Sequence, residues 1–350
     1  MRNEATAGVS TDNLTTSYLL CCDWGTSVFR LRLMNTLTFE CVAEVMSPAG
    51  IAGTFDDWKR SNEQTGISNE HFFRRQLKTQ IDRLAAKTTI RLADIPVVIS
   101  GMASSSIGMA EVPYANLPFA TDGSQSGVRH FAAQAEFPHE MMLVSGVRSQ
   151  QDVMRGEETQ LIGLIELLDL PTDVITEVVF IFPGTHSKHL YIQAGQLVNF
   201  DTYMTGELFS LLATQSILSD SVDVSDLTLF NEHDTDVFRQ GVTEAQSSEM
   251  LNRLFTVRTN QLFGKLTKKQ NALYLSGLLI GTELKPLSTN ENGQIVLCSG
   301  SNLSAFYSVA IETLGLSDRT VTVSPDLIDR AASVGQIILF QNQTVKAITG

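Results

Sequence analysis

Short segments of apolar or alternating residues open the chain and predict three consecutive strands. Residues 17–23 form an apolar run, and residues 28–34 alternate apolar with basic side chains, as a half-buried strand does. A third strand is expected over residues 39–46, followed by a turn-rich segment over residues 47–53. Gly25 lies between the first two strands, so we expect these strands to form a hairpin.

The same order of elements returns in the second half of the chain. An amphipathic helix over residues 70–87 and a short buried strand over residues 96–100 complete the first set. The second set comprises a strand at 178–182, a turn at 183–188, a hairpin at 189–193 and 196–201, a helix at 207–216, a strand at 295–298 and helices at 303–314 and 326–343. Gly184 stands at a corner equivalent to that of Gly25, which indicates a duplicated architecture.

A strand that ends in an acid and is followed by Gly-Thr-Ser has the composition of a phosphate-binding corner. Gly25 permits a close backbone approach and a positive φ, and the hydroxyls of Thr26 and Ser27 add hydrogen bonds to those of the turn amides. Asp23 would hold Mg²⁺ through water. The alternative is that Asp23 and Gly25 merely form a hairpin turn. A second corner at residues 184–187 favours phosphate binding, because a polyphosphate can be gripped between two corners.

Two adjacent carboxylates, Glu157 and Glu158, stand at the start of an apolar helix that continues from Leu161. The helix dipole favours acids in a first turn, so both residues can be purely structural. A carboxylate fixed at a helix start between two domains is also well placed to accept a hydroxyl proton. Composition does not choose between these two interpretations.

The composition is that of an ordinary globular protein and excludes several classes of function. Hydrophobic residues make up 43% and charged residues 18% of the chain, and its length of 350 residues is enough for about two domains. The net charge of −13 disfavours binding to nucleic acid or to anionic membranes. The four cysteines lack metal-ligand spacing and are expected to be buried thiols of a reducing compartment. We expect a cytoplasmic protein in which residues 1–16 are a disordered tail.

Several longer motifs keep one order along the chain. They are residues 22–27 (CDWGTS) followed by Arg30, Gly101-Met102, Pro113-Tyr114 with Leu117-Pro118, residues 153–163 (VMRGEETQLIG), 183–188 (PGTHSK), 204–208 (MTGEL) and 275–281 (LSGLLIG). Together they cover nearly the whole chain from about residue 17, and they resemble the 2-dehydro-3-deoxygalactonokinases. That family belongs to the larger group of actin-like ATPases, sugar kinases and heat-shock proteins.

The resemblance implies an α/β fold with two RNase H-like (actin-like ATPase) domains around an interdomain cleft. The first domain is expected over residues 17–154, with a C-terminal helix at about 331–350 packing back on it. The second, nucleotide-binding domain is expected over residues 155–330, and Gly156 at the crossing is a candidate hinge. The implied reaction is phosphorylation of 2-dehydro-3-deoxy-D-galactonate at its 6-hydroxyl, with ATP and Mg²⁺ as cofactors. A homodimer is also considered.

The resemblance also assigns roles to individual positions. Glu157 matches the catalytic base, with Glu158 as its rival, and Asp23 matches the metal-binding carboxylate. Nucleotide-binding residues are then expected at Gly25, Thr26, Ser27, Gly184, Thr185, His186, Ser187, Lys188, Ser299, Gly300 and Ser301. Residues expected to bind the sugar acid are Gly101, Met102, Ser104, Ser105, Arg155 and Glu207.

The carboxylate of such a substrate requires a cation in the cleft. We expect Arg155 in this role first, followed by Lys188, His186 and Arg30. For Arg30 an equally good interpretation is that it shares an exposed strand face with Arg32.

The loop over residues 101–109 departs from the family pattern, which has Gly-Ser-Asn and Gly-Trp where this chain has Ser104-Ser105-Ser106 and Gly108-Met109. Serine restricts the backbone approach that glycine allows, and methionine lacks the rigid wall of tryptophan. A kinase for another sugar or another 2-keto-3-deoxy sugar acid is therefore an alternative. A non-catalytic sugar-sensing protein of the same fold is a second alternative.

Overall fold

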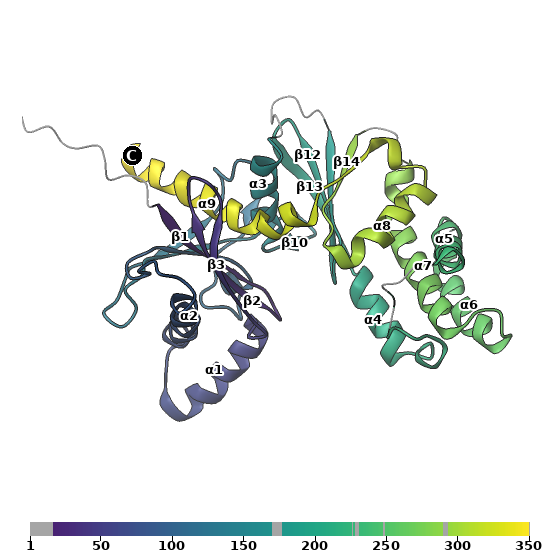
Figure 1. Ribbon diagram of the computed structural model, residues 1–350, viewed down its shortest axis with the longest axis horizontal. Helices are drawn as coiled ribbons and strands as arrows, with labels where there is room; N and C mark the ends of the chain where they lie inside the picture. Colours follow the sequence, from purple (N-terminus) through teal and green to yellow (C-terminus); the bar gives the residue numbers. More distant parts are fainter. Residues whose placement is uncertain are drawn as a thin grey trace, which may run out of the picture.

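The computed structural model contains two six-stranded sheets with helices on their faces (Figure 1). It describes residues 17–169, 177–225, 227, 231–247, 249–289 and 293–349. The predicted disordered tail, residues 1–16, lies outside the described residues. Within the described part of the chain, no helix combines the length and the apolar character needed to cross a membrane.

The first sheet grows from the predicted N-terminal hairpin. The strands β1 (Tyr18–Trp24), β2 (Phe29–Asn35) and β3 (Cys41–Ser47) are antiparallel neighbours. On the other side of β1 the sheet continues in parallel with β4 (Val97–Gly101) and β8 (Met141–Val144), and β7 (Val128–Phe131) closes the edge. β1 is therefore a central strand, and Asp23 lies next to its C-terminal end.

The second sheet repeats this arrangement. The strands β11 (Val178–Phe182), β12 (Ser187–Gln193) and β13 (Gln196–Tyr203) are antiparallel neighbours, and β14 (Gln294–Leu297) and β15 (Thr320–Thr322) extend the sheet in parallel. A short strand from the first half, β6 (Phe119–Ala120), pairs with β13. Both sheets thus contain the strand order 3-2-1-4-5, counted from the first strand of each set. The predicted α/β fold with two RNase H-like units is confirmed.

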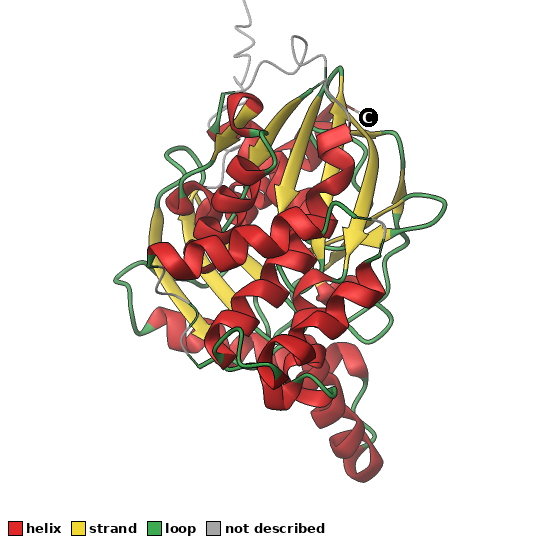
Figure 2. Cartoon of the chain, turned by 90° about the vertical axis from the view of Figure 1, so that its right-hand side faces the viewer, coloured by secondary structure: helices red, strands yellow, loops and turns green. Residues whose placement is uncertain are grey.

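The helices and sheets stack in layers. The helices are α1 (Ile51–Thr65), α2 (Asn69–Ala85), α3 (Glu157–Leu167), α4 (Thr205–Gln215), α5 (Glu232–Glu244), α6 (Met250–Leu262), α7 (Lys268–Thr289), α8 (Ser301–Thr313) and α9 (Pro325–Thr349). Apolar side chains of α2 pack on one face of the first sheet, and α3 and α9 share a core cluster with residues of both sheets. The helices α5, α7 and α8 cover the outer face of the second sheet (Figures 1 and 2).

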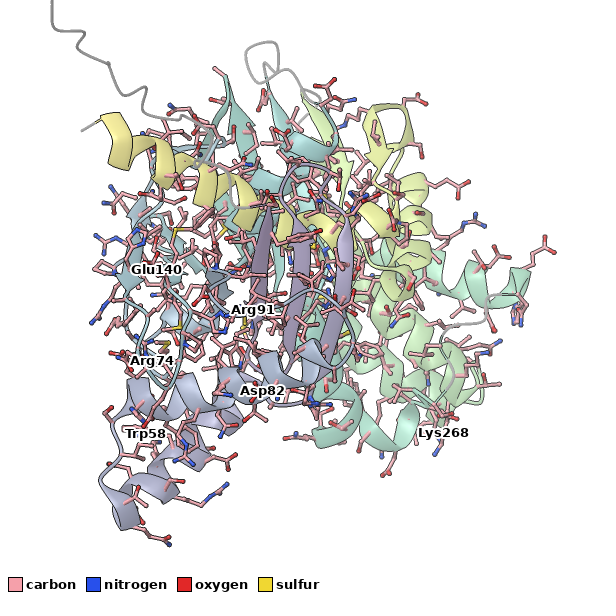
Figure 3. All side chains as sticks on the ribbon, turned by 60° about the vertical axis from the view of Figure 1, so that its left-hand side comes forward. Trp58, Arg74, Asp82, Arg91, Glu140 and Lys268 are labelled. Atoms are coloured by element: carbon pink, nitrogen blue, oxygen red, sulfur yellow. The ribbon has the colours of Figure 1, made fainter. Side chains whose placement is uncertain are left out.

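The prediction of a turn over residues 47–53 is wrong in its second half, because α1 begins at Ile51 and includes Gly53. Only Ile51 and Thr54 are buried in this helix, although its apolar residues do recur at helical spacing. Trp58, labelled in Figure 3, fixes the helix to the following loop by donating its indole N–H to the carbonyl of Ile67 at 3.0 Å.

Two surface predictions for the first unit are also wrong. Arg32 is only 4% exposed, so Arg30 and Arg32 do not share an exposed strand face. The cause is α9, which packs over this face and whose Asp329 pairs with both arginines. Of the four cysteines expected to be buried, Cys41 is exposed, because β3 is an edge strand. The domain boundaries stay predictions.

The helices α3 and α9 cross in direct backbone contact. A Cβ atom added at Gly163 would lie 1.9 Å from the carbonyl oxygen of Ala331, and one at Gly335 would lie 1.9 Å from that of Thr159. Such distances leave no room for a side chain, so the crossing depends on glycine at both positions. Thr159 is one residue beyond Glu158, so the crossing also fixes the start of α3.

This contact predicts a large effect of a single methyl group. We expect Gly335→Ala to lower the free energy of unfolding by about 1–3 kcal/mol or more, because the helices must separate. The measurement is urea unfolding followed by circular dichroism. Gly53→Ala is the matched control, since nothing lies within 4 Å of its Cβ position, and alanine there should stabilise the helix slightly. Equal stability of Gly335→Ala and the wild type would contradict the proposed constraint.

Candidate active site

The first glycine corner is held by the start of α1. Gly25, Thr26 and Ser27 form the turn after β1, and the latter two are exposed. The backbone N–H of Ile51 donates to the carbonyl of Gly25 at 2.9 Å. A Cβ atom at Gly50 would lie 2.3 Å from the carbonyl oxygen of Thr26, so glycine lets the helix approach the loop. The sequence predicts only a turn residue at Gly50 and carries no signal of this contact.

The second glycine corner is held in the same way by the start of α4. The backbone N–H of Glu207 donates to the carbonyl of Thr185 at 3.0 Å. A Cβ atom at Gly206 would lie 2.6 Å from the carbonyl oxygen of Gly184. The duplication inferred from the sequence therefore extends to the helix behind each corner. The motif over residues 204–208 serves this contact.

The end of the first sheet meets the start of α3 at two further glycines. Gly101 has φ +85°, and a Cβ atom there would lie 2.9 Å from the Trp24 carbonyl oxygen and 3.4 Å from Asp23 Oδ1. Gly156 has φ +112°, and its Cβ position is 3.7 Å from the Cα of Gly101. Both glycines thus adopt a backbone that disfavours other residues. They bring Asp23 and Glu157 to one place.

The two adjacent glutamates differ in their bonding. Glu158 is 1% exposed, and its carboxylate accepts hydrogen bonds from the Gly156 N–H at 2.8 Å and from the Thr159 hydroxyl at 2.9 Å. In Glu157, Oε2 is buried and has no hydrogen-bond partner among the described residues. A buried oxygen without a partner is costly, unless a bound group supplies one.

The carboxyl groups here hold their protons more tightly than usual. Burial raises the pKa of Glu157, and Asp23 raises it further, while Lys188 opposes the shift. Burial, assisted by the charge of Glu157, raises the pKa of Glu158 to about 7. Burial also raises the pKa of Asp23, against the opposing effect of Arg30. The site therefore favours proton uptake at a carboxylate.

The predicted cations of the second corner lie at different depths. Lys188 is 6% exposed and donates to the carbonyl of Val153 at 3.0 Å and to the hydroxyl of Thr202 at 2.5 Å. It therefore links β12 to the segment that leads into α3. His186 instead pairs with Glu207, and both side chains are partly exposed.

The other predicted nucleotide-binding residues split in the same way. Ser187 is fully buried, and its hydroxyl oxygen accepts from the N–H of Gly184 at 3.3 Å. Ser299 is fully buried as well, whereas Gly300 and Ser301 are exposed at the N-terminus of α8. The two buried serines thus shape the loops from behind.

The loop that was expected to bind the sugar acid is braced by Arg155. Its Nη1 donates to the hydroxyl of Ser104 at 2.6 Å, and its Nη2 donates to the carbonyl of Val112 at 3.3 Å. Its guanidinium carbon lies 3.9 Å from the ring centroid of Tyr114. Ser105 donates its hydroxyl to the carbonyl of Met102, so neither predicted serine is free. Arg30 lies opposite Asp23 in the β1–β2 pairing, and its guanidinium pairs with carboxylates of α9 and β3.

A mostly apolar pocket of about 210 Å³ opens beside the second corner. It is lined by Gly184, Thr205, Gly206, Phe209, Leu227, Ser276, Leu279, Ile280, Asn302, Leu303, Phe306 and Tyr307. Three of these residues belong to the motif over residues 275–281. The two glycines of this motif let α7 pack closely against α5 instead of lining the pocket. A Cβ atom at Gly277, for example, would lie 2.3 Å from the carbonyl oxygen of Phe238 on α5. The pocket has the size and apolar lining that suit a planar base.

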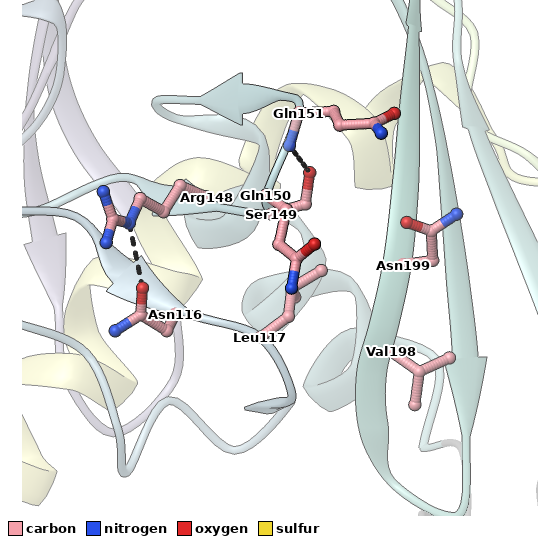
Figure 4. Close-up of a pocket in the computed structure, with 8 residues that line it drawn as sticks. All are labelled: Asn116, Leu117, Arg148, Ser149, Gln150, Gln151, Val198 and Asn199. Atoms are coloured by element: carbon pink, nitrogen blue, oxygen red, sulfur yellow. Dashed lines mark hydrogen bonds between the residues drawn. The ribbon is translucent and has the colours of Figure 1, made fainter.

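A larger hollow of about 700 Å³ lies between a three-stranded sheet, β5 (Ala115–Asn116), β9 (Val147–Arg148) and β10 (Val153–Met154), and the strand β13 (Figure 4). Amide side chains and Arg148 line it, and Arg148 donates to Asn116 at 2.9 Å. None of the predicted site residues lines it. Its volume alone does not make it the active site, because the buried carboxylates lie elsewhere.

No group of three or more His, Cys, Asp or Glu side chains in the described part of the chain is arranged to hold a metal ion.

Comparison with known proteins points to one family. A sequence model described as 2-keto-3-deoxy-galactonokinase matches residues 23–333. A 2-dehydro-3-deoxygalactonokinase of Escherichia coli is 30% identical over 280 residues, which are 74% of this chain and 89% of that protein. A Rhizobium meliloti protein, named as a probable 2-dehydro-3-deoxygalactonokinase, is 29% identical over 320 residues, 88% of this chain and 93% of its own.

A solved structure agrees with these sequence matches. It is a Sinorhizobium meliloti protein assigned provisionally as a 2-dehydro-3-deoxygalactonokinase, and it superposes with a TM-score of 0.70 at 27% identity. The superposition covers 95% of this chain and 97% of the other.

The raised pKa of Glu158 predicts a pH-dependent stability. Its pKa is about 7 in the folded protein against 4.5 ordinarily, so the folded state binds more protons than the unfolded state between these values. Stability should therefore fall as the pH rises from about 4.5 to about 7. Glu158→Gln should weaken this dependence, to which Glu157 and Asp23 also contribute. It should gain up to about 3 kcal/mol relative to wild type near pH 7 and little near pH 4.5, measured by urea unfolding.

Glu166→Gln, at an exposed position of the same helix, is the matched control for this measurement. A Glu158→Gln protein whose stability parallels that of the wild type at every pH would contradict the raised pKa.

Proposed function

Because the chain belongs to the 2-keto-3-deoxy-galactonokinase family, we propose that it transfers the γ-phosphoryl group of ATP to the 6-hydroxyl of 2-dehydro-3-deoxy-D-galactonate. One observation carries the proposal: the buried, unpartnered Oε2 of Glu157 lies where the first sheet meets the start of α3. A hydroxyl group bound there would supply the missing partner. The cytoplasmic location and the homodimer remain predictions.

ATP would bind along the second corner. The apolar pocket beside Gly184 suits the adenine ring, with Asn302 and Leu303 of α8 on one wall. Open space next to the Cα of Gly184 would let phosphates approach the backbone of Thr185. Gly25, Thr26 and Ser27 would contact the terminal phosphate from the first corner, through backbone amides and exposed hydroxyls. The two corners would then hold one triphosphate between them.

Glu157 would act as the general base. The 6-hydroxyl oxygen attacks the γ-phosphorus as the bond to ADP breaks, and Oε2 of Glu157 takes the hydroxyl proton. Glu158 is the weaker candidate, because its carboxylate already accepts two hydrogen bonds within its own helix start. Lys188, anchored between β12 and Val153, would keep Glu157 ionised until the hydroxyl arrives.

Asp23 would orient Mg²⁺ through water beside the first corner. The ion, when bound, would neutralise charge on the phosphate oxygens. The half-buried carboxylate at the end of β1, next to exposed hydroxyls, fits this role.

The sugar acid would bind against the loop that begins at Gly101 and Met102. Ser104 and Ser105 are engaged with the loop itself, so they would shape the wall, with Arg155 as the nearest cation for the substrate carboxylate. Glu207, held by His186 at the start of α4, would face the substrate from the second domain. These assignments make substrate choice depend on the departures from the family pattern in this loop.

The activity predicts a specific substrate profile. Purified protein with ATP and Mg²⁺ should phosphorylate 2-dehydro-3-deoxy-D-galactonate at least 10-fold faster, by kcat/KM, than its stereoisomers and neutral sugars, with ADP release coupled to 6-phosphate formation. Phosphorylation of neutral sugars alone would favour the alternative kinase. Nucleotide binding without any transfer would favour the sugar-sensing alternative.

The base assignment predicts a split between turnover and binding. Glu157→Gln should lower kcat by about 10²–10⁴, since the amide cannot take a proton, while the Kd for ATP stays within a few-fold. Steady-state kinetics and calorimetric titration measure the two quantities. Glu166→Gln is the matched control and should retain full turnover. Normal turnover in Glu157→Gln together with a loss in Glu158→Gln would move the role to Glu158.

A further inference from the structure

We propose that Glu283 is a positioning residue for nucleotide binding: its buried carboxylate locks the second corner, the start of α4 and the pocket-lining helix α8 into one unit. The inference rests on the proposed function. Glu283 lies on α7 and is 1% exposed. It follows the motif over residues 275–281 and is not itself part of it.

Three donors converge on this carboxylate from three different elements. His189 Nε2 of β12 lies 3.1 Å from Oε1, and the hydroxyl of Tyr307 on α8 donates to Oε2 at 2.7 Å. The hydroxyl of Thr205, the first residue of α4, also donates to Oε2. Because a carboxylate only accepts hydrogen bonds, the direction of each bond is fixed. One side chain of α7 therefore ties β12, α4 and α8 together.

The bonds continue from the carboxylate to the corner itself. Tyr307 uses its proton on Glu283, so it accepts from the hydroxyl of Ser187 at 3.1 Å. Ser187 in turn accepts from the backbone N–H of Gly184 at 3.3 Å. A continuous series of hydrogen bonds therefore runs from the backbone of the second corner to the carboxylate of Glu283. This series holds the N–H of Gly184 pointing toward the protein interior.

The same residues form the wall of the apolar pocket. Thr205 and Tyr307 line it, as does Gly184 at its mouth. Leu279 lies one helical turn before Glu283 and lines it too, so that face of α7 serves the pocket and the network together. Loss of the carboxylate would let the base-binding wall and the phosphate-binding corner move apart. Such a shift weakens binding of a molecule that must contact both.

Glu283 is a buried carboxylate at a position where a residue that only filled space would be apolar. Leaving three buried donors with an incomplete acceptor is costly, and the network stays rigid only when complete. Glu283→Gln keeps the size of the side chain but replaces one acceptor oxygen by an NH₂ group, so all three hydrogen bonds persist only if His189 changes its tautomer. Tyr307→Phe removes one hydroxyl and breaks the chain toward Gly184.

The test measures binding of a non-hydrolysable ATP analogue and steady-state kinetics on the full chain. We expect Glu283→Gln to raise the Kd for the analogue and the KM for ATP about 10-fold, with less than a 2-fold change in KM for the sugar acid. Tyr307→Phe should shift the same constants in the same direction by about 3-fold. Because both residues act in one network, the double variant should lose less than the product of the two effects.

Two matched controls separate positioning from stability. Tyr274 on α7 is fully buried and donates to Glu244 at 2.6 Å, away from the pocket. Tyr274→Phe should lower the melting temperature without changing the KM for ATP. The same holds for Glu244→Gln, whose side chain is partly exposed and also pairs with Arg253. Folded Glu283→Gln and Tyr307→Phe proteins with unchanged nucleotide constants would overturn the proposal.

The binding assay also distinguishes this proposal from the proposed function. If the wild type binds the analogue but phosphorylates no sugar acid, the kinase assignment fails, and the role of Glu283 is still decided by the Kd values. If the wild type binds no nucleotide, both proposals are overturned.

Discussion

The backbone contact between α3 and α9 is the constraint on which the rest of this structure depends. These helices lie between the two sheets and share a core with both. The glycines at their crossing remove the side chains that would hold them apart. Because α3 begins at Glu157, only two residues before Thr159 in this contact, the depth of the crossing decides how far Glu157 is inserted between the sheets. The core of the fold and the position of the candidate base are thus set by one contact.

Close backbone approach through glycine recurs wherever an element must support a loop. Gly50 and Gly206 stand at the starts of the helices that hold the two corners, and Gly101 and Gly156 bring the end of the first sheet against α3. In each case the neighbouring atom belongs to backbone, which cannot rotate away as a side chain can. The corners are therefore supported by rigid elements instead of by flexible side chains. This suits a site that must hold a polyphosphate in line with an acceptor.

The sequence predicts the strands around β1 and β11 and the equivalence of the two corners, because period-two patterns and turn residues are local signals. It does not predict α1, because the turn residues of segment 47–53 conceal where that helix begins. Nor does it predict the burial of Arg32, which depends on α9 arriving from the far end of the chain. The choice between Glu157 and Glu158 is equally invisible in sequence. The proposed choice of Glu157 rests on a single oxygen, its buried Oε2, which has no hydrogen-bond partner among the described residues.

The charges at the site also explain why nucleotide and metal would bind together. Asp23, Glu157 and Glu158 are close enough to raise proton affinity, and Lys188 is the main cation that opposes this at Glu157. A polyphosphate would add further negative charge to a protein whose net charge is already −13. Repulsion of this kind is relieved when a divalent cation accompanies the phosphates. In the proposed mechanism, the acidic pair at the start of α3 would therefore tolerate an anionic substrate only when a divalent cation is bound with the nucleotide. Proton uptake by Glu157 would then require both substrates to be present.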